Sequence, residues 1–343
     1  MTREEMTSYE RVMTALSLGQ PDRVPVVPSA TAFSFKNAGF KYSECLFDAD
    51  KHVQAQLRLR GDFGVDGVWG PSSNAVPEGV GATLRIPEDN PPVVAEPRLK
   101  SYADLDRLEP LPITKTGRVP LLLNIARQLR KALGPDVPMF AIAPTPYTLA
   151  TDLRGAQSLY KDMVRNPEFV ARLMEFCVQP AIDYGTALME AGADIIWVPD
   201  PLCGTTCMSR KHYERLSHPY VKRMFDELRA KGAKIVYHLC GDWHDRFDLA
   251  SQSVHGWHLA IEADLASLKR DYGRKITLMG NVRSVDMLYG TVEDVERESL
   301  RCIEQGAEGG GFILSSDCGL PRDTLPANVL AMVKTGKEHG KYQ

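Results

Sequence analysis

The chain has 343 residues, of which 43% are hydrophobic and 25% are charged, a composition that supports a large buried core. The net charge is −3 and the pI about 6.3, so neither nucleic acid nor an anionic membrane is an expected partner. Because no apolar run approaches the ~20 residues that span a bilayer and no apolar signal segment is visible, we expect a cytoplasmic protein.

Eight short apolar runs alternate along the chain with longer amphipathic stretches. The expected strands are residues 23–29, 64–70, 138–144, 194–200, 234–240, 256–262, 275–281 and 310–316. Helices are expected over 166–190 and 209–231, with Asn166 and Ser209 as their N-caps. Near-continuous apolar strands that alternate with helices are typical of a parallel sheet. Eight strands predict an α/β fold, the closed (β/α)8 TIM barrel, with a doubly wound open sheet as the alternative.

Residues 71–120 interrupt this alternation because they are rich in proline and poor in helical periodicity. We interpret them as an excursion between the second and third strands that lies over one end of the barrel and could contain a hairpin. The sequence shows no internal repeat and no convincing linker. We therefore expect residues 1–343 to form a single barrel domain.

Polar side chains and thiols follow several of the expected strands, at the end where barrel enzymes carry their chemistry. They are Asp200, Cys203, Cys207, His238, Cys240, Glu262, Asp264, Asn281, Asp317 and Cys318. For any one of them, hydrogen bonding to loop amides is an alternative explanation. A functional prediction therefore needs several of them to converge.

His238 and Cys240 are the pair that converges most directly, because residues i and i+2 of a strand share one face. Cys318, at the end of the eighth strand, could join them across the barrel. A His/Cys/Cys set suits Zn²⁺, and three protein ligands leave the fourth position open for catalysis. The alternative is a buried histidine beside two unrelated buried cysteines.

The seven cysteines are too scattered and odd in number for a disulfide framework, so most are expected to be small buried hydrophobic residues. Cys203 and Cys207 could form a metal-binding pair, but they lie in a loop of small residues without an obvious third ligand. His244 could also be a ligand. We expect it instead in the first turn of the following helix, facing solvent or substrate.

Five motifs in collinear order resemble the uroporphyrinogen decarboxylase superfamily. They are YERVMTALSLGQPDRVPVVPS at 9–29, PTPYTLATDLRG at 144–155, HLCG at 238–241, LMGNV at 278–282 and GGFILSSDCGLPRDT at 310–324. The resemblance covers residues from about 5 to about 335 and points to the methylcobamide:coenzyme M methyltransferase-like branch. It implies a (β/α)8 barrel, in agreement with the strand count.

Two segments distinguish the branches of this superfamily. The decarboxylases carry an Arg-Gln-Ala-Gly-Arg loop that grips the carboxylates of their substrate, whereas this chain has Lys-Asn-Ala-Gly-Phe at 36–40. A tetrapyrrole with many carboxylates would lack its bidentate arginine partners here. The methyltransferase-like branch is marked by His-x-Cys and a distant Cys, which His238, Cys240 and Cys318 match. The resemblance therefore implies a zinc site on these three residues.

The resemblance implies a zinc-dependent methyltransferase that moves a methyl group between a corrinoid and a small thiol or a methoxy or methylthio substrate. The corrinoid would be cobalamin or a separate corrinoid protein, because the chain contains no Asp-x-His-x-x-Gly motif. The expected partners are thus a small-molecule methyl donor or acceptor and a corrinoid protein, with a homodimer left open. The alternatives are a cofactor-free decarboxylase of the uroporphyrinogen type and a barrel that binds a corrinoid protein without catalysis.

Four further residues fall at positions that match the family and are candidate catalytic residues. Glu78, in a segment similar to the family's Glu-Ala-x-Gly, is a candidate zinc ligand or proton donor, or a solvated loop side chain. Asp200, Asn281 and Tyr147 could shape the pocket, and a purely structural role is the alternative for each.

Overall fold

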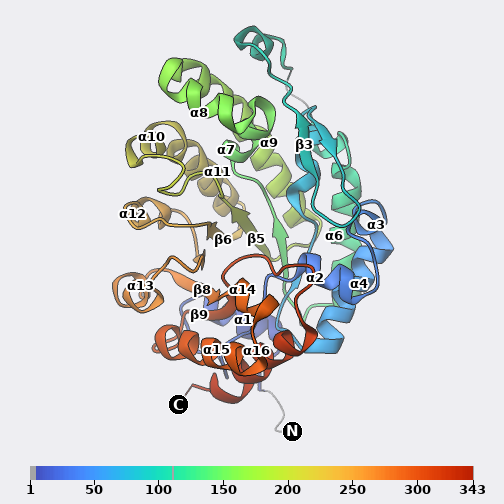
Figure 1. Cartoon of the computed structure of the whole chain (residues 1–343), viewed down its shortest axis with the longest axis vertical. Coiled ribbons are helices and arrows are strands. Elements are labelled where there is room, and N and C mark those ends of the chain that lie inside the picture. The colour runs from blue at the N-terminus through green and yellow to red at the C-terminus, as the bar shows by residue number, and fades with distance from the viewer. Residues whose placement is uncertain (1–4, 110–111, 343) are drawn as a thin grey trace.

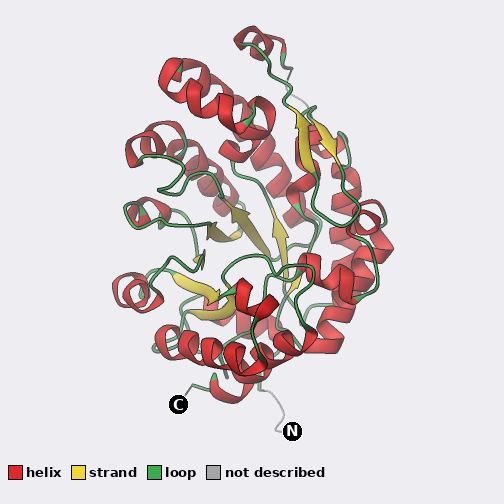
Figure 2. Ribbon diagram, in the orientation of Figure 1, coloured by secondary structure: helices red, strands yellow, loops and turns green. Residues whose placement is uncertain are grey.

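The computed structural model describes residues 5–109 and 112–342, without the side chain of Asn74; residues 1–4, 110–111 of the excursion, and 343 lie outside the described residues. The chain forms an α/β fold around a parallel sheet in the order β1-β4-β5-β6-β7-β8-β9 (Figure 1, Figure 2). These strands are β1 (Val68–Trp69), β4 (Met139–Ile142), β5 (Ile195–Pro199), β6 (Lys234–Leu239), β7 (Gly256–Leu259), β8 (Thr277–Val282) and β9 (Phe312–Ser316). Each overlaps an expected apolar run.

The first expected strand, residues 23–29, closes this sheet into a barrel. Val26 forms a parallel bridge with Leu314 of β9. On its other side, the Val26 carbonyl accepts a hydrogen bond from the N–H of Asp66 at 2.8 Å, just before β1. Two prolines in the segment have no N–H to donate, which limits it to isolated pairing. The predicted (β/α)8 barrel is confirmed, with its first strand reduced to a bridge.

Helices surround the barrel and connect its strands (Figure 2). They are α1 (Ser8–Leu16), α2 (Thr31–Asn37), α3 (Tyr42–Phe47), α4 (Ala49–Phe63), α5 (Val76–Gly79), α6 (Val119–Leu133), α7 (Pro146–Arg154), α8 (Ala156–Arg165), α9 (Pro167–Glu190), α10 (Arg210–Leu216), α11 (His218–Ala230), α12 (Phe247–Ala250), α13 (Leu265–Tyr272), α14 (Ser284–Tyr289), α15 (Val292–Gly306) and α16 (Pro326–His339). Within the described residues, none of these helices combines the length and apolar character needed to cross a membrane.

The two helices predicted from periodicity have different outcomes. Asn166 caps α9 as expected, since its side chain accepts a hydrogen bond from the N–H of Phe169 at 3.1 Å. Ser209 likewise caps α10, but the stretch 209–231 forms two helices that meet at Ser217. Pro219 explains the break, because a proline cannot donate to the preceding turn and its ring clashes with it. The prediction of a single helix is wrong here.

The excursion contains an antiparallel hairpin formed by β2 (Thr83–Arg85) and β3 (Val93–Glu96), together with α5 and short 3-10 turns. The hairpin lies at the upper right of Figure 1. Its loop reaches the carboxyl-terminal side of the barrel, where Asp89 pairs with Arg322 of the loop after β9 at 2.8 Å. The excursion therefore borders the end of the barrel that carries the candidate site.

Side chains fill the barrel in two layers, one inside the sheet and one between the sheet and its helices. The inner layer joins three residues of α1 to residues from most strands: Val12, Ala15, Leu16, Val27, Trp69, Phe140, Ile142, Ile195, Trp197, Val236, Met279 and Ile313. Helix α1 thus packs against the inside of the barrel at its amino-terminal end. The opposite, carboxyl-terminal end remains for the candidate site.

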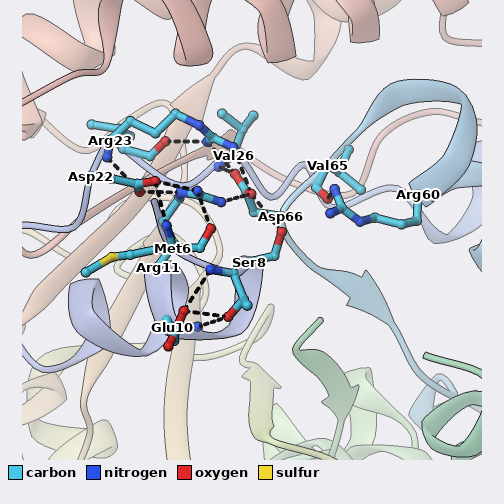
Figure 3. Close-up of polar contacts among 12 residues, drawn as sticks. Met6, Ser8, Glu10, Arg11, Asp22, Arg23, Val26, Arg60, Val65 and Asp66 are labelled. Carbon is cyan, nitrogen blue, oxygen red and sulfur yellow. Dashed lines mark hydrogen bonds and ion pairs between the residues drawn. The ribbon is translucent and has the colours of Figure 1, made fainter. Parts of the chain in front are cut away.

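Buried charges fix α1 and the closing segment at the amino-terminal end (Figure 3). Asp66 Oδ1 accepts hydrogen bonds from Ser8, Arg11 and Arg23 at 2.8–3.0 Å, and Oδ2 accepts from Arg23 at 2.7 Å and from the N–H of Val26 at 2.8 Å. Burial alone would raise the pKa of Asp66, but the hydrogen bonds and charges of the arginines lower it overall. This carboxylate is therefore ionised and fully bonded in the folded chain.

Candidate functional site

His238 lies near the carboxyl end of β6, on the face that points into the barrel. Val236, two residues earlier, belongs to the inner layer, so the alternation of the strand places His238 on the same side, and Cys240 follows directly after β6 ends. The strand register sets His238 beside Pro199 of β5 and His258 of β7. The inward face of His238 agrees with the sequence-based inference, and the shared face of Cys240, which lies beyond the end of β6, stays a prediction.

The His238 ring has two aromatic neighbours, which also contact each other. It stacks on Trp197 with centroids 4.7 Å apart and planes at 19°, and its other ring neighbour is His258, at 4.4 Å and 34°. Nδ1 lies 3.2 Å from the carbonyl oxygen of His258, whereas Nε2 is buried without a hydrogen-bond partner. Burial and then the charge of His258 hold the pKa of His238 well below its ordinary value. The ring is therefore neutral.

Cys240 and Cys318 are close enough to influence one another electrostatically. Cys240 is partly buried, and its pKa is raised first by burial and then by the negative charge of Cys318. Cys318 is exposed as a residue, but desolvation of its thiol still raises its pKa. Across residues 5–109 and 112–342, no three His, Cys, Asp or Glu side chains stand ready to hold a metal ion. The His238–Cys240–Cys318 ligand set therefore stays a prediction.

Glu262 brings a carboxylate to the same place, just beyond the end of β7. Its negative charge is among the causes that raise the pKa of both Cys240 and Cys318. The sequence marked Glu262 only as one of several polar strand ends. In the structure, the negative charge of Glu262 acts on both thiols. Residue spacing along the chain does not predict this.

Asp200 is fully buried where β5 ends. Its Oδ2 accepts a hydrogen bond of 2.6 Å from the hydroxyl of Tyr237, and its Oδ1 has no partner. Burial raises the pKa of Asp200 to about 6, against the opposing effect of the Tyr237 hydrogen bond. Its backbone N–H donates to the carbonyl of His238 at 3.1 Å. Asp200 thus borders the candidate ligands from the β5 side.

The other three candidate catalytic residues make structural contacts. The Tyr147 hydroxyl is buried against the sulfur of Met163 at 3.3 Å. The side-chain amide of Asn281 donates to the carbonyls of Ala260 and Ala263 at 3.1 Å, which ties β8 to the loop after β7. Glu78 pairs with Arg118 at 2.8 Å. These contacts agree with the structural alternative for each, and they do not test a catalytic role.

The residues expected not to bind metal hold the loop of Cys240 in place. Cys203 is buried, with its sulfur 3.3 Å from the Ser217 hydroxyl, and Cys207 is exposed. Between them, Gly204 approaches so closely that a Cβ there would lie 3.1 Å from the Cys240 carbonyl oxygen. Small residues in this loop are therefore explained by close backbone packing.

His244 lies in a turn before α12 and not in a helix, which corrects the expected position. Its side chain is largely exposed, and Nδ1 contacts Asp242 at 2.7 Å. The turn forms because Asp242 Oδ1 also accepts from the N–H of His244 at 3.0 Å, a local bond that competes with helix formation.

His258 is the residue at this site that the sequence analysis missed. It lies in the middle of the expected strand 256–262, fully buried, on the same face as the small residues Gly256 and Ala260. A histidine between two small residues on an inward face is a pattern that could have identified it as a candidate site residue. Its meaning depends on β7 lying next to β6 in register, which one sequence does not reveal.

Comparisons with known proteins agree with this architecture. The family model "Uroporphyrinogen decarboxylase (URO-D)" matches residues 7–339. A methylcobamide:CoM methyltransferase, MtbA of Methanosarcina acetivorans, is 26% identical over 345 residues, covering 98% of this chain and 99% of the relative. A uroporphyrinogen decarboxylase of Myxococcus xanthus is 30% identical over 315 residues, covering 85% of this chain and 82% of the relative.

The fold is also similar to that of a methyltransferase from Methanosarcina mazei, with a TM-score of 0.89 at 23% identity over 97% of this chain and 99% of that one. This likeness concerns the fold alone. The family model, in contrast, spans nearly the whole sequence, from the capped helix α1 to the end of α16. The chain belongs to the uroporphyrinogen decarboxylase family, within which it resembles the methylcobamide:coenzyme M methyltransferases.

Proposed function

We propose that this protein is a zinc-dependent methyltransferase that moves a methyl group between a corrinoid and a small thiol or a methoxy or methylthio substrate. The observation that carries the proposal is the buried, unpartnered Nε2 of His238, on the inward face of β6 two residues before Cys240. A neutral imidazole nitrogen without a hydrogen bond is what a metal ligand requires. The methylcobamide:CoM methyltransferase relatives support the corrinoid part of the proposal.

His238, Cys240 and Cys318 would hold the zinc, because two thiols and an imidazole form a donor set typical of this metal. Without a metal, burial and the surrounding negative charges raise the pKa values of both thiols. A divalent cation would offset this repulsion and allow both to ionise. Bound zinc supplies a Lewis acid that lowers the pKa of a substrate thiol or polarises the oxygen or sulfur of a methyl donor.

The side chains around these ligands would orient the site and keep water from it. Trp197 stacks on the His238 ring, His258 packs beside both of them, and Asp200 fixes the end of β5 next to His238. Glu262 is a carboxylate whose charge acts on both thiols, so it is suited to receive a proton or to complete the ligand set.

The transfer itself conserves atoms and electrons. When a thiol is the acceptor, its sulfur bonds to the methyl carbon, the thiol proton goes to solvent, and the electron pair of the cobalt–carbon bond remains on cobalt, which passes from Co(III) to Co(I). When a methoxy or methylthio compound is the donor, the electron pair of Co(I) would form the bond to the methyl carbon. The carbon–oxygen or carbon–sulfur bond would break with its pair on the leaving atom, which takes a proton from solvent. The corrinoid supplies this chemistry, and the barrel would position the partners.

The loop at 36–40 bears on the decarboxylase alternative. Relatives of that name are 30% identical or less in the matches described above, so ancestry alone does not exclude it. The segment at 36–40 lacks both arginines, and Lys36, the remaining cation, pairs with Asp323. A polycarboxylate substrate would have to break this pair to gain one cation.

The experiment begins with zinc analysis of the purified protein, followed by methylcobalamin mixed with a panel of small thiols. We expect about one zinc per chain and formation of Co(I), seen as a change in the corrinoid spectrum, with at least one thiol. A metal-free protein that decarboxylates uroporphyrinogen would contradict the proposal. Zinc with corrinoid binding but no transfer in either direction would favour the non-catalytic barrel.

A further inference from the structure

Two imidazoles, those of His238 and His258, contact each other inside the barrel next to the apolar inner layer. Buried imidazoles require partners for their polar atoms, and an apolar side chain would fill the same space without that cost. Three of the four ring nitrogens of His238 and His258 have a partner, and the fourth is Nε2 of His238. The arrangement therefore leaves one nitrogen free at the site.

The partners of His258 fix which of its nitrogens carries the proton. The indole N–H of Trp197 can only donate, and it lies 3.2 Å from Nδ1, so Nδ1 accepts. Nε2 lies 2.6 Å from the carbonyl oxygen of Ser316, which can only accept, so Nε2 carries the hydrogen. Ser315 adds a second oxygen 3.3 Å from Nε2 and donates its own proton to the Val27 carbonyl at 2.7 Å.

A hydrogen-bond partner also fixes the tautomer of His238. Its Nδ1 faces the His258 carbonyl at 3.2 Å and must donate, which leaves Nε2 of the neutral ring as a bare lone pair. The His258 backbone is paired with β6 and β8, and its side chain adds bonds to β5 and β9. These added bonds restrain the His258 ring and the strand whose carbonyl orients His238.

We propose that His258, held by Trp197 and Ser316, is a positioning residue that keeps His238 in the Nδ1–H tautomer with its Nε2 lone pair ready for a metal ion. This inference rests on the proposed function only for the identity of the metal. It assigns to His258 no contact with substrate. Outer partners that orient a ligating histidine typically change metal affinity by about 10–100-fold when removed.

The first test needs no metal. Protein with ¹⁵N-labelled histidine, stripped of metal by a chelator, is studied by two-bond ¹H–¹⁵N spectra, with the His238 and His258 signals assigned from variants. We expect the Nδ1–H tautomer for His238 and the Nε2–H tautomer for His258. A His238 ring that carries its proton on Nε2, or exchanges between both forms in the native chain, would overturn the proposal.

The second test compares variants by competition for zinc with a coloured chelator. His258→Ala should lower zinc affinity by about 10–100-fold and give His238 a mixed tautomer population. His258→Gln, whose amide can still donate toward Ser316, should recover part of the loss. Trp197→Phe keeps an aromatic face on His238 but removes the indole donor, so it should shift the tautomer of His258 and weaken zinc binding less.

Phe140→Leu is the matched control, because its ring packs on Trp69 in the same lumen and its loss destabilises the core in a similar way. It should lower thermal stability and leave zinc affinity within about twofold. Equal zinc affinity in His258→Ala and the native chain would show that His258 only packs, and would refute the proposal. If the native chain binds no zinc, the proposed function fails, and the tautomer of His238 still decides the positioning proposal.

Discussion

The two ends of the barrel treat buried polar groups in opposite ways. At the amino-terminal end, both oxygens of Asp66 are bonded, to two arginines, Ser8 and a backbone N–H. At the carboxyl-terminal end, His238 Nε2 and Asp200 Oδ1 are buried without partners. An unpartnered buried polar atom costs about 1–3 kcal/mol. Such atoms also occur away from the site, for example Tyr184 Oη and Ser299 Oγ, so the contrast is one between Asp66 and His238.

This difference matches the division of labour in barrels, in which the amino-terminal end contributes stability and the carboxyl-terminal end contributes chemistry. It also predicts how substitutions divide. Changes around Asp66 should alter the free energy of unfolding and leave the zinc site intact. Changes at Cys240 should do the reverse.

Asp66→Asn should have the largest effect. The substitution turns an oxygen that accepts from an arginine or from Val26 into an N–H₂ group and removes the negative charge that faces Arg11 and Arg23. Breaking a buried ion pair in this way costs about 3–5 kcal/mol, measurable by urea unfolding. Asp106→Asn is the control, since its pair with Arg172 is 60% exposed on both sides and should contribute at most about 1 kcal/mol. A loss of zinc from folded Asp66→Asn protein would contradict the division between the two ends.

Cys240→Ser should act on the other end. We expect zinc affinity and methyl transfer to fall by at least about 100-fold, beyond the range seen when an outer partner of a ligand is removed. The free energy of unfolding, measured with a chelator present, should change by no more than about 0.5–1 kcal/mol, because the core does not need the partly buried thiol. Cys207→Ser, at an exposed thiol, serves as the control. Unchanged zinc content in Cys240→Ser would refute the ligand assignment.

The sequence predicted what depends on local periodicity. Seven strands and the inward face of His238 follow from alternation within a strand, which needs no knowledge of neighbours. The first strand was harder, because its prolines leave a bridge in place of a ladder. The stretch 209–231 divides into two helices at Ser217, just before Pro219, although the helical pattern of its apolar residues continues.

Long-range features of the site could not be predicted in this way. His258 matters because β7 lies beside β6 in a register that pairs His238 with His258, and because Trp197 arrives from β5. The charge of Glu262 acts on both thiols because Glu262 follows β7, which lies between β6 and β9 in the sheet order. The small residues around Gly204 indicated only a loop without an obvious third ligand, whereas Gly204 allows two backbones to approach.

The pH dependence of stability should separate the two ends more finely. The pKa of Asp66 is lowered in the folded chain, so the unfolded chain binds this proton first as the solution becomes acidic. The stability that ionised Asp66 gives the folded chain is therefore fully present above the ordinary pKa of a free carboxyl, about 3.9. It is lost as the pH falls through the lower pKa of the folded chain. Unfolding free energies at pH 6, 5, 4 and 3 should fall more steeply for the native chain than for Asp66→Asn. Parallel curves would mean that Asp66 does not control acid stability.

The smallest effects are expected for Cys203→Ala and Cys207→Ala, singly or together. Cys207 is exposed, and its replacement should change stability by about 0.5 kcal/mol or less. Cys203 is buried against Ser217, so Cys203→Ala removes one buried sulfur and should cost about 1 kcal/mol. Zinc content, measured by atomic absorption, and methyl transfer should remain close to native values, since the backbone of this loop and not its thiols approaches Cys240. If the double variant lost its zinc while remaining folded, Cys203 and Cys207 would be the metal ligands. The unpartnered nitrogen of His238 would then need a different explanation.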